Sequence, residues 1–229
     1  MSHTREKVIQ ENTNLKLGLI PRRKFEKILD IGCSDGVISE KIKNITQSKV
    51  VGIDNCKERY LLARERGIEV VEGDVNQKLP FADDSFDFVF AGEIIEHVIS
   101  PDDLLLEVKR VLKKEGIFVL TTPNLASWHN RILLLFGILP YSSEVSTKDS
   151  RVGMGILKKV KQQLPAGHIR VFTLGAMKDI LNMYGFRIDK IQGRPTDYLP
   201  YPFRYIEKLI SLFPSVASGF IVRSINEKK

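Results

Sequence analysis

The stretch LDIGCSDG, residues Leu29–Gly36, predicts a buried strand, a tight turn and the start of a helix. Gly32 lets the backbone at the turn approach a ligand closely, and Gly36 leaves room for the following helix to pack. Backbone N–H groups at such a turn can hold a ligand. The stretch therefore predicts a binding loop at the carboxyl end of the first strand.

The spacing of this loop narrows the class of ligand. It reads D-x-G-x-x-x-G and not the G-x-G-x-x-G of dinucleotide-binding proteins, which argues against an NAD-dependent oxidoreductase. Asp30 would repel a pyrophosphate, whereas it suits a cationic ligand that carries an ammonium group.

Strands and helices alternate along the first half of the chain. The predicted strands are Lys27–Gly32, Lys49–Asp54, Ile68–Asp74, Phe86–Gly92, Gly116–Pro123, Phe186–Gly193 and Gly219–Ile225. The spacers are of helix length, and Ser100 is a suitable cap for the helix after the fourth strand. This alternation predicts an α/β fold, in which a mostly parallel sheet has helices on both faces.

The whole chain, 1–229, is expected to be a single domain with three additions. Residues 1–24 are expected to form an N-terminal helical extension. Residues 125–167 and 194–218 are too long for simple connections and are rich in aromatic residues. We expect these two insertions to cover the carboxyl ends of the strands as lids and to select the substrate.

Two more acidic residues follow the second and third predicted strands. Asp54 can accept both hydroxyls of a ribose, and Asp74 can accept a hydrogen bond from an adenine amino group while the Val75 N–H donates to the ring. In an open α/β sheet, ligands bind at the carboxyl ends of the strands. Asp30, Asp54 and Asp74 therefore predict one crevice.

The sequence resembles the class I S-adenosylmethionine-dependent methyltransferases. The resemblance extends over nearly the whole chain and is carried by LDIGCSDG, VVGID, VEGDV, LPFADDSFDFVFAGEIIEHV, PDDLLLEVKRVLKKEGIFVLTTPN and GHIRVFT. It implies a Rossmann-like, seven-stranded sheet whose last strand is antiparallel and lies between the fifth and the sixth. One departure is Ser34, which stands at the middle glycine of the usual motif.

The resemblance also implies a site for S-adenosylmethionine. Glu93, after the fourth strand, would lie beside the methyl group that is transferred. The other expected cofactor-binding residues cradle the methionine part or contact the ribose and the adenine. With Glu93, the full set is Asp30, Gly32, Cys33, Gly36, Asp54, Asp74, Val75 and Glu93.

The stretch AGEIIEHV, residues Ala91–Val98, leaves two interpretations open. If it begins a helical turn, Glu93, Glu96 and His97 share one face and, with His168, could bind Mg²⁺ or Mn²⁺. The sequence is similar in this respect to the ubiquinone-pathway catechol O-methyltransferases and the small-RNA 3′-terminal 2′-O-methyltransferases. By default no metal is assigned, and His97 and His168 are the candidate catalytic residues beside the acceptor.

The expected function is therefore methyl transfer to a small-molecule or lipid-like acceptor, at an oxygen. The net charge of +7 favours an anionic acceptor, but no RNA-binding signature is present, so nucleic acid is not expected as a partner. RILLLFGILPY and YIEKLISLF could rest on a membrane surface. Two cysteines and a polar N-terminus favour the cytoplasm. The alternatives are a metal-dependent O-methyltransferase of a catechol or of an RNA 3′-terminal ribose, and a non-catalytic subunit with this fold.

Overall fold

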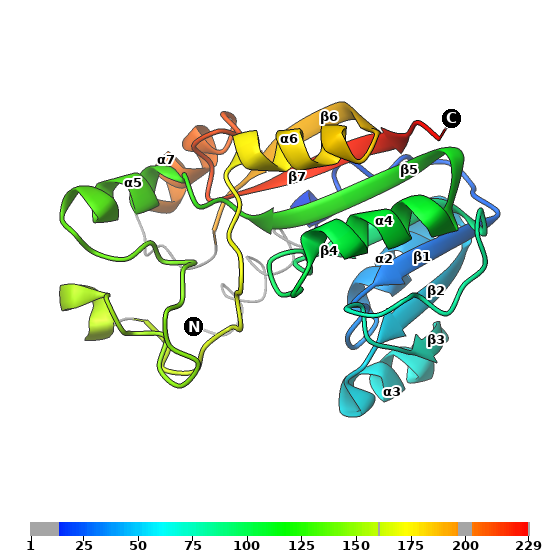
Figure 1. Cartoon of the computed structure of the whole chain (residues 1–229), viewed down its shortest axis with the longest axis horizontal. Coiled ribbons are helices and arrows are strands. Elements are labelled where there is room, and N and C mark those ends of the chain that lie inside the picture. The colour runs from blue at the N-terminus through cyan, green and yellow to red at the C-terminus, as the bar shows by residue number, and fades with distance from the viewer. Residues whose placement is uncertain (1–13, 160, 197–202, 229) are drawn as a thin grey trace.

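Seven strands form one twisted sheet at the centre of the molecule, as a computed structural model shows (Figure 1). The structure describes residues 14–159, 161–196 and 203–228. The strands are β1 (Lys27–Ile31), β2 (Lys49–Asp54), β3 (Glu69–Glu72), β4 (Phe86–Gly92), β5 (Leu112–Pro123), β6 (Phe186–Arg194) and β7 (Gly219–Asn226). Their order in the sheet is β3-β2-β1-β4-β5-β7-β6.

The first five strands are parallel, and β7 runs antiparallel between β5 and β6. This arrangement confirms the expected sheet, including the reversed last strand. The parallel strands end along one edge, and β7 begins at that same edge, where Gly219 pairs with Pro123.

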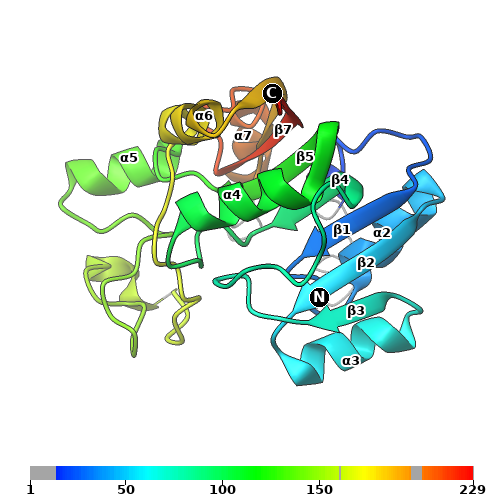
Figure 2. The same cartoon turned by 45° about the vertical axis from the view of Figure 1, so that its right-hand side comes forward.

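Helices cover both faces of the sheet, as Figure 2 shows from a second direction. The helices of the first half are α2 (Val37–Thr46), α3 (Lys57–Glu65) and α4 (Pro101–Val111), and α6 (Leu174–Met183) precedes β6. The apolar residues of α4 and α6 join the larger core, and those of α2 join the core on the opposite face. In β4 the side chains alternate between these cores, since Val89 belongs to one while Phe88 and Phe90 belong to the other.

The boundaries of α4 follow from its local sequence. The Ser100 hydroxyl accepts a hydrogen bond from the Asp103 N–H (3.1 Å), and Pro101 occupies the first helical position. The helix passes directly into β5 at Leu112, so this strand starts four residues earlier than Gly116, the expected start. The extra residues interrupt the pairing with β4, whose register shifts between Phe86 and Phe88.

The two insertions extend beyond the carboxyl ends of the parallel strands (Figure 1). The first contains α5 (Trp128–Leu135) and the short 3₁₀ helix η1 (Gly155–Lys159), and the second contains α7 (Phe203–Ile210). The Asn124 side chain links them, because its amide donates to the Ala217 carbonyl (2.9 Å) at the end of the second insertion. Most of the expected N-terminal extension, 1–24, lies outside the described residues.

Candidate active site

A cavity of about 210 Å³, here called the strand-end cavity, lies at the carboxyl ends of the first strands. Gly32, Asp54, Asp74 and Val75 line it, as does His97 from the loop after β4. The structure thus brings together four of the residues expected to bind the cofactor. They come from the ends of β1, β2 and β3, which the parallel topology places side by side.

The two glycines of the first loop have separate structural roles. Gly32 has a φ of +72°, and a Cβ there would lie 2.0 Å from Cδ1 of Ile94, so the two loops meet only because this side chain is absent. Gly36 has a φ of +78°, and a Cβ there would lie 2.7 Å from Cβ of Ala63. Gly36 therefore lets α2 begin directly against α3 and lies behind the cavity wall.

The Asp54 carboxylate is held in place by the backbone around it. Its Oδ2 accepts a hydrogen bond from the Ser34 N–H (2.9 Å), and its Oδ1 accepts one from the Cys56 N–H (2.8 Å). Each oxygen retains a further lone pair, so this fixed carboxylate can accept two hydroxyls of a ligand.

The Asp74 carboxylate is similarly fixed beside the strand-end cavity. Its Oδ1 accepts from the backbone and side-chain N–H groups of Asn76, at 2.9 and 3.0 Å. Both of these hydrogen bonds use one oxygen, so the carboxylate can also accept from an amino group of a ligand.

Asp30 and Cys33 lie behind the loop and not on the cavity wall. Asp30 is buried and accepts a hydrogen bond from the Ser39 hydroxyl (2.5 Å). Burial raises the pKa of Asp30 to about 7, with a smaller contribution from the nearby Asp54 charge. The Cys33 side chain packs in a small apolar cluster with Tyr60, and burial raises the pKa of its thiol. These two side chains support the loop from within.

A second cavity, of about 230 Å³, lies between the sheet edge and the insertions and is called the insertion cavity here. Glu93, His168 and Arg194 line it where it meets the sheet, and Tyr141 and Lys161 line it from the first insertion. Residues of the insertions therefore form part of the wall of this cavity, and their role in selecting the substrate stays a prediction.

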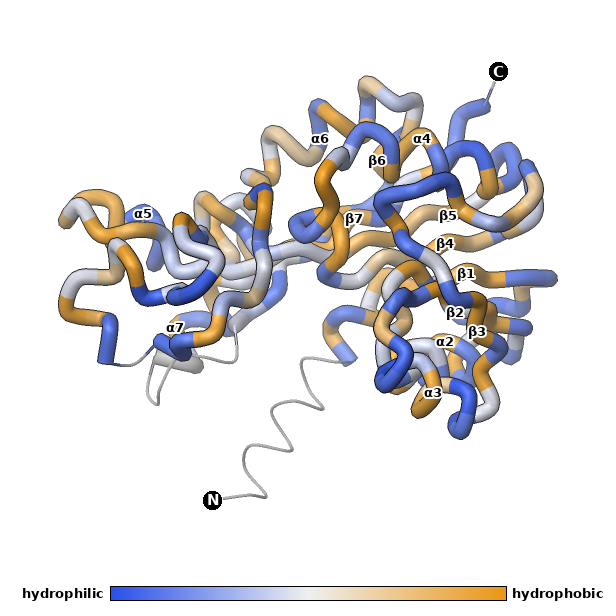
Figure 3. The backbone as a smooth tube through the Cα atoms, turned by 60° about the horizontal axis from the view of Figure 1, so that its bottom comes forward, coloured by the Kyte–Doolittle hydropathy of each residue, from blue (hydrophilic) through white to orange (hydrophobic). Residues whose placement is uncertain are grey.

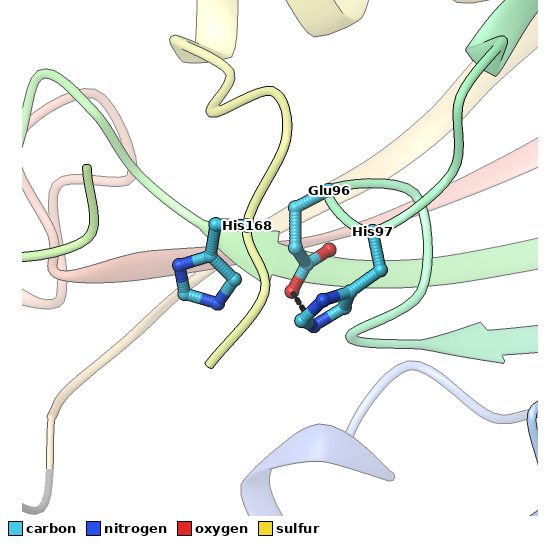
Figure 4. A group of neighbouring side chains, drawn as sticks. All are labelled: Glu96, His97 and His168. Atoms are coloured by element: carbon cyan, nitrogen blue, oxygen red, sulfur yellow. Dashed lines mark ion pairs between the residues drawn. The ribbon is translucent and has the colours of Figure 1, made fainter. Parts of the chain in front are cut away.

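Two histidines stand between the cavities. His97 lines the strand-end cavity, His168 lines the insertion cavity, and their ring centroids are 4.9 Å apart. Figure 4 shows His97 and Glu96 on the loop after β4 and His168 on the segment that leads to α6. Both histidines expected to be catalytic are therefore adjacent, at the place where ligands in the two cavities would meet.

Backbone carbonyls orient both imidazole rings. His97 Nδ1 lies 3.1 Å from the Gly167 carbonyl oxygen, and His168 Nδ1 lies 2.8 Å from that of Ser142. A carbonyl only accepts, so each Nδ1 carries a hydrogen and each Nε2 is the atom that can take up a proton or bind an ion. Burial lowers the pKa of His97, which keeps this ring neutral at neutral pH.

Glu96 is the third member of this group. It is fully buried, its Oε2 accepts from the Thr122 hydroxyl (3.0 Å), and its Oε1 has no hydrogen-bond partner among the described residues. Oε1 lies 4.0 Å from His97 Nε2. Burial, followed by the Glu93 charge, raises the pKa of Glu96 to about 8. Glu96 therefore holds a proton at neutral pH unless a cation approaches.

Glu93 does not join this group, which corrects the expected four-residue metal set. The chain does not continue as a helix after β4: Glu93 has a φ of +58°, and one turn closes where the His97 N–H donates to the Ile94 carbonyl (2.9 Å). Among the described residues, only Glu96, His97 and His168 form a group of three acidic, histidine or cysteine side chains whose ligand atoms all lie within 4.8 Å of one another. Of the three residues of E-x-x-E-H, Glu96 and His97 lie in this group and Glu93 does not.

The Glu93 carboxylate instead pairs with Arg194, 101 residues away. The guanidinium donates to both carboxylate oxygens at 3.0 and 2.9 Å, and the Thr121 hydroxyl donates at 2.7 Å. Burial, the largest single influence, would raise the pKa of Glu93, but the Arg194 charge together with the Lys16 charge and the Thr121 hydrogen bond lowers the pKa below its usual range. The sequence did not identify Arg194 as a site residue, since no local motif surrounds it.

The sequence also did not identify Glu144, which positions His168. Its carboxylate accepts from the backbone N–H groups of Ala166 and Gly167, each at 2.8 Å, and of His168 at 3.2 Å. On the other side of His168, the Arg170 guanidinium donates to the carbonyl of Ile99, in the loop after β4. The histidine is thus held from both the insertion and the sheet.

Comparison with known proteins shows what this chain is similar to. Residues 29–120 match a family described as a methyltransferase domain. A ubiquinone biosynthesis O-methyltransferase from Maricaulis maris is 33% identical over 118 residues, which are 48% of this chain and 46% of the relative. A mitochondrial ubiquinone biosynthesis O-methyltransferase from Saccharomyces cerevisiae is 29% identical over 197 residues, which are 80% of this chain and 55% of the relative.

Solved structures agree on the fold. A structure of S-adenosylmethionine-dependent methyltransferases from Methanosarcina mazei superposes with a TM-score of 0.64 at 21% identity, covering 94% of this chain and 98% of that one. The matched part of the chain spans about half the length of the two ubiquinone-pathway relatives. Fold similarity alone therefore leaves the acceptor to be inferred from the cavities.

Proposed function

We propose that the chain is a class I S-adenosylmethionine-dependent methyltransferase that methylates an oxygen of a small, lipid-like acceptor with an anionic group. The observation that carries this proposal is the pair of histidines between two cavities. One cavity has the carboxylates that suit an adenosine, and the other is enclosed by the insertions.

The residues of the strand-end cavity fit the cofactor. Asp54, whose carboxylate is held by the Ser34 N–H, would accept the ribose hydroxyls, and Asp74, held by the Asn76 N–H, would accept from the adenine amino group. When bound, S-adenosylmethionine supplies a methyl group on a positively charged sulfur, which a nucleophile can attack in line. The protein's part is to orient the acceptor and to remove its proton.

The histidines supply the base. With its Nδ1 hydrogen committed to a carbonyl, His168 presents Nε2 as the proton acceptor for a hydroxyl in the insertion cavity. His97, which burial keeps neutral, lies next to His168 and is a second proton acceptor. Glu144 positions His168 for this role.

Cationic groups in the insertion cavity favour an anionic acceptor. The Lys161 ammonium donates to the Tyr141 carbonyl (2.8 Å), a neutral partner, and burial lowers the pKa of this lysine. Arg194 Nε is buried with no hydrogen-bond partner among the described residues. A carboxylate or phosphate on the acceptor would complete the hydrogen bonds of both groups.

The test is transfer of tritiated methyl from S-adenosylmethionine to fractions of a cell extract. We expect label in small, organic-extractable acids, with loss of most labelling in His168→Ala and in Asp54→Ala. Asp179→Ala, an exposed change on α6, is the matched control and should label as the wild type does. If no fraction is labelled although the protein binds the cofactor, the chain is a non-catalytic subunit with this fold.

A second candidate is a metal-dependent O-methyltransferase that acts on two neighbouring hydroxyls. The observation that favours it is Oε1 of Glu96, which accepts no hydrogen bond from the described residues and lies beside His97, with His168 within reach of the same ion. One carboxylate and two imidazoles suit Mn²⁺ or a similar divalent cation. These residues would hold the ion, which would acidify a bound hydroxyl.

Binding of Mn²⁺, followed by electron paramagnetic resonance, tests this candidate independently of activity. The metal candidate requires saturable binding that Glu96→Ala and His97→Ala each weaken at least about tenfold. It also requires that EDTA abolishes methyl transfer. Activity that survives chelation, together with absence of Mn²⁺ binding, excludes it.

A further inference from the structure

Helix α7 turns its polar side inward and its apolar side outward. Glu207 and Ser211, one helical turn apart, are buried, with Glu207 only 1% exposed. Leu209 is 65% exposed, and in the turn that follows the helix Leu212 is 72% exposed. Ile206 on the helix and Phe213 in the turn extend this exposed apolar stripe. A surface helix of a soluble protein normally has the opposite orientation.

Polar contacts of Glu207 fix this orientation. Its carboxylate accepts hydrogen bonds from the Trp128 indole (2.5 Å), from the Thr196 N–H (3.2 Å) and from the Ser218 hydroxyl. Rotating the helix to bury its leucines would expose these groups or leave buried donors without partners. The outward stripe is therefore a stable feature of the fold.

Helix α5 has the same inverted pattern. Asn130 is buried, where its amide donates to the Asn124 carbonyl (3.1 Å) and its oxygen accepts from the Tyr141 N–H (2.8 Å). On the outer side Leu135 and Phe136 are exposed. Figures 1 and 3 show α5 and α7 at the same end of the molecule, and the contact between Trp128 and Glu207 joins them.

The charge of this end indicates what covers the apolar residues. The two insertions contain nine basic and four acidic residues, and so hold five of the seven net positive charges of the chain. On the helices themselves, Arg131 and Lys208 are exposed, whereas Glu207 is buried. An apolar stripe with basic flanks is complementary to a surface that is both apolar and anionic. A second copy of the same positively charged end would be repelled.

We propose that the apolar stripes of α5 and α7 dock the protein on the surface of a bilayer that contains anionic phospholipid. None of the described helices combines the length and the apolar character that crossing a bilayer requires. The helices would lie in the interface plane, with their leucines and Phe213 among the acyl chains and their basic side chains at the headgroups. This proposal does not depend on the proposed methyl transfer.

The test is co-sedimentation of the full chain with vesicles of phosphatidylcholine alone, or of phosphatidylcholine with phosphatidylglycerol. We expect binding to the anionic vesicles that weakens as salt rises, and much weaker binding to the neutral ones. The double change Leu209→Ser and Leu212→Ser should lower partitioning into anionic vesicles at least about tenfold, since two apolar side chains no longer insert.

The matched control is Leu61→Ser with Leu62→Ser on α3, which also changes two exposed leucines but lies at the opposite end of the sheet (Figure 1). This control should partition as the wild type does. Thermal unfolding of both double variants checks that each is folded.

Three results would overturn the proposal. The first is absence of binding to anionic vesicles, and the second is equal loss of binding in the two double variants. The third is sedimentation of the vesicle-free protein as a dimer that Leu209→Ser with Leu212→Ser dissociates, because the stripe would then be a contact between copies.

Discussion

At the scale of single residues, the Glu93–Arg194 pair joins the loop after β4 to the end of β6. Arg194 and Glu93 are largely buried, with side-chain exposures of 11% and 26%. Removing one partner of such a pair leaves the other charge without compensation, which costs more than the pair itself contributes.

Replacing Arg194 by Met should therefore lower the free energy of unfolding by about 2 kcal/mol near pH 8. The loss should be smaller near pH 5, because the pKa of Glu93 rises without the guanidinium and the carboxyl can then take up a proton. Urea unfolding at the two pH values measures both effects. Arg187→Met is the matched control: its pair with Glu227 is exposed, and less than about 1 kcal/mol should be lost.

Asp30 predicts a pH dependence of stability. Its pKa is about 7 in the folded protein and 3.8 ordinarily, so between these values the folded state keeps a proton that the unfolded state has lost. The stability contributed by this group is complete below the lower value and is lost as the pH rises through about 7.

Asp30→Asn should remove this dependence, since an amide can accept the same bond from Ser39 and does not titrate. Relative to this variant, the wild type should lose roughly 3 kcal/mol of stability between pH 4 and pH 7. Thermal or urea unfolding across this range measures the difference. Parallel stability curves for the two proteins would contradict the burial of a protonated Asp30.

Single residues also show what sequence could predict about the site. Asp54, Asp74 and Val75 were predicted because each follows a strand, and parallel strands end together. Arg194 and Glu144 could not be predicted, since their partners lie 101 and more than 20 residues away. Only the folded chain brings such partners together.

At the scale of secondary-structure elements, the close contact between α2 and α3 depends on Gly36. Gly36→Ala would place a Cβ 2.7 Å from Cβ of Ala63, in a backbone conformation with positive φ. We expect a loss of about 2 kcal/mol in the free energy of unfolding, and weaker cofactor binding because the loop must move.

Gly175→Ala on α6 is the control for this change. A Cβ there would meet only Thr173 Oγ1, at 3.8 Å, so the substitution should be neutral or stabilise by up to about 1 kcal/mol. Urea unfolding of both variants compares the two sites. Equal losses at Gly36 and Gly175 would contradict the packing argument.

The elements differ in how well local sequence predicts them. The cap and apolar stripe of α4 predicted that helix, whereas the run after β4 formed one turn because Glu93 adopts a positive φ and turns toward Arg194. Within the insertions, the local sequence predicted helix α5. The orientation of α7 was not, since it is set by hydrogen bonds to Glu207 from two other segments.

At the scale of the whole molecule, two cavities with different linings lie at the carboxyl ends of the strands. The carboxyl edge of the sheet presents fixed acidic groups in the strand-end cavity, and the insertions enclose a second cavity with basic groups. The alternation of strands and helices predicted this sheet, and the resemblance to a known family predicted its reversed last strand. The contents of the second cavity depend on long connections whose paths no local pattern determines.

The central claim is that the strand-end cavity binds S-adenosylmethionine through Asp54, and isothermal titration calorimetry tests it most directly. We predict saturable binding of S-adenosylmethionine to the wild type and to Asp179→Ala, at least about tenfold weaker binding to Asp54→Ala, and none of NAD. Absence of S-adenosylmethionine binding to the folded wild type, or equal affinity in Asp54→Ala, would contradict the account.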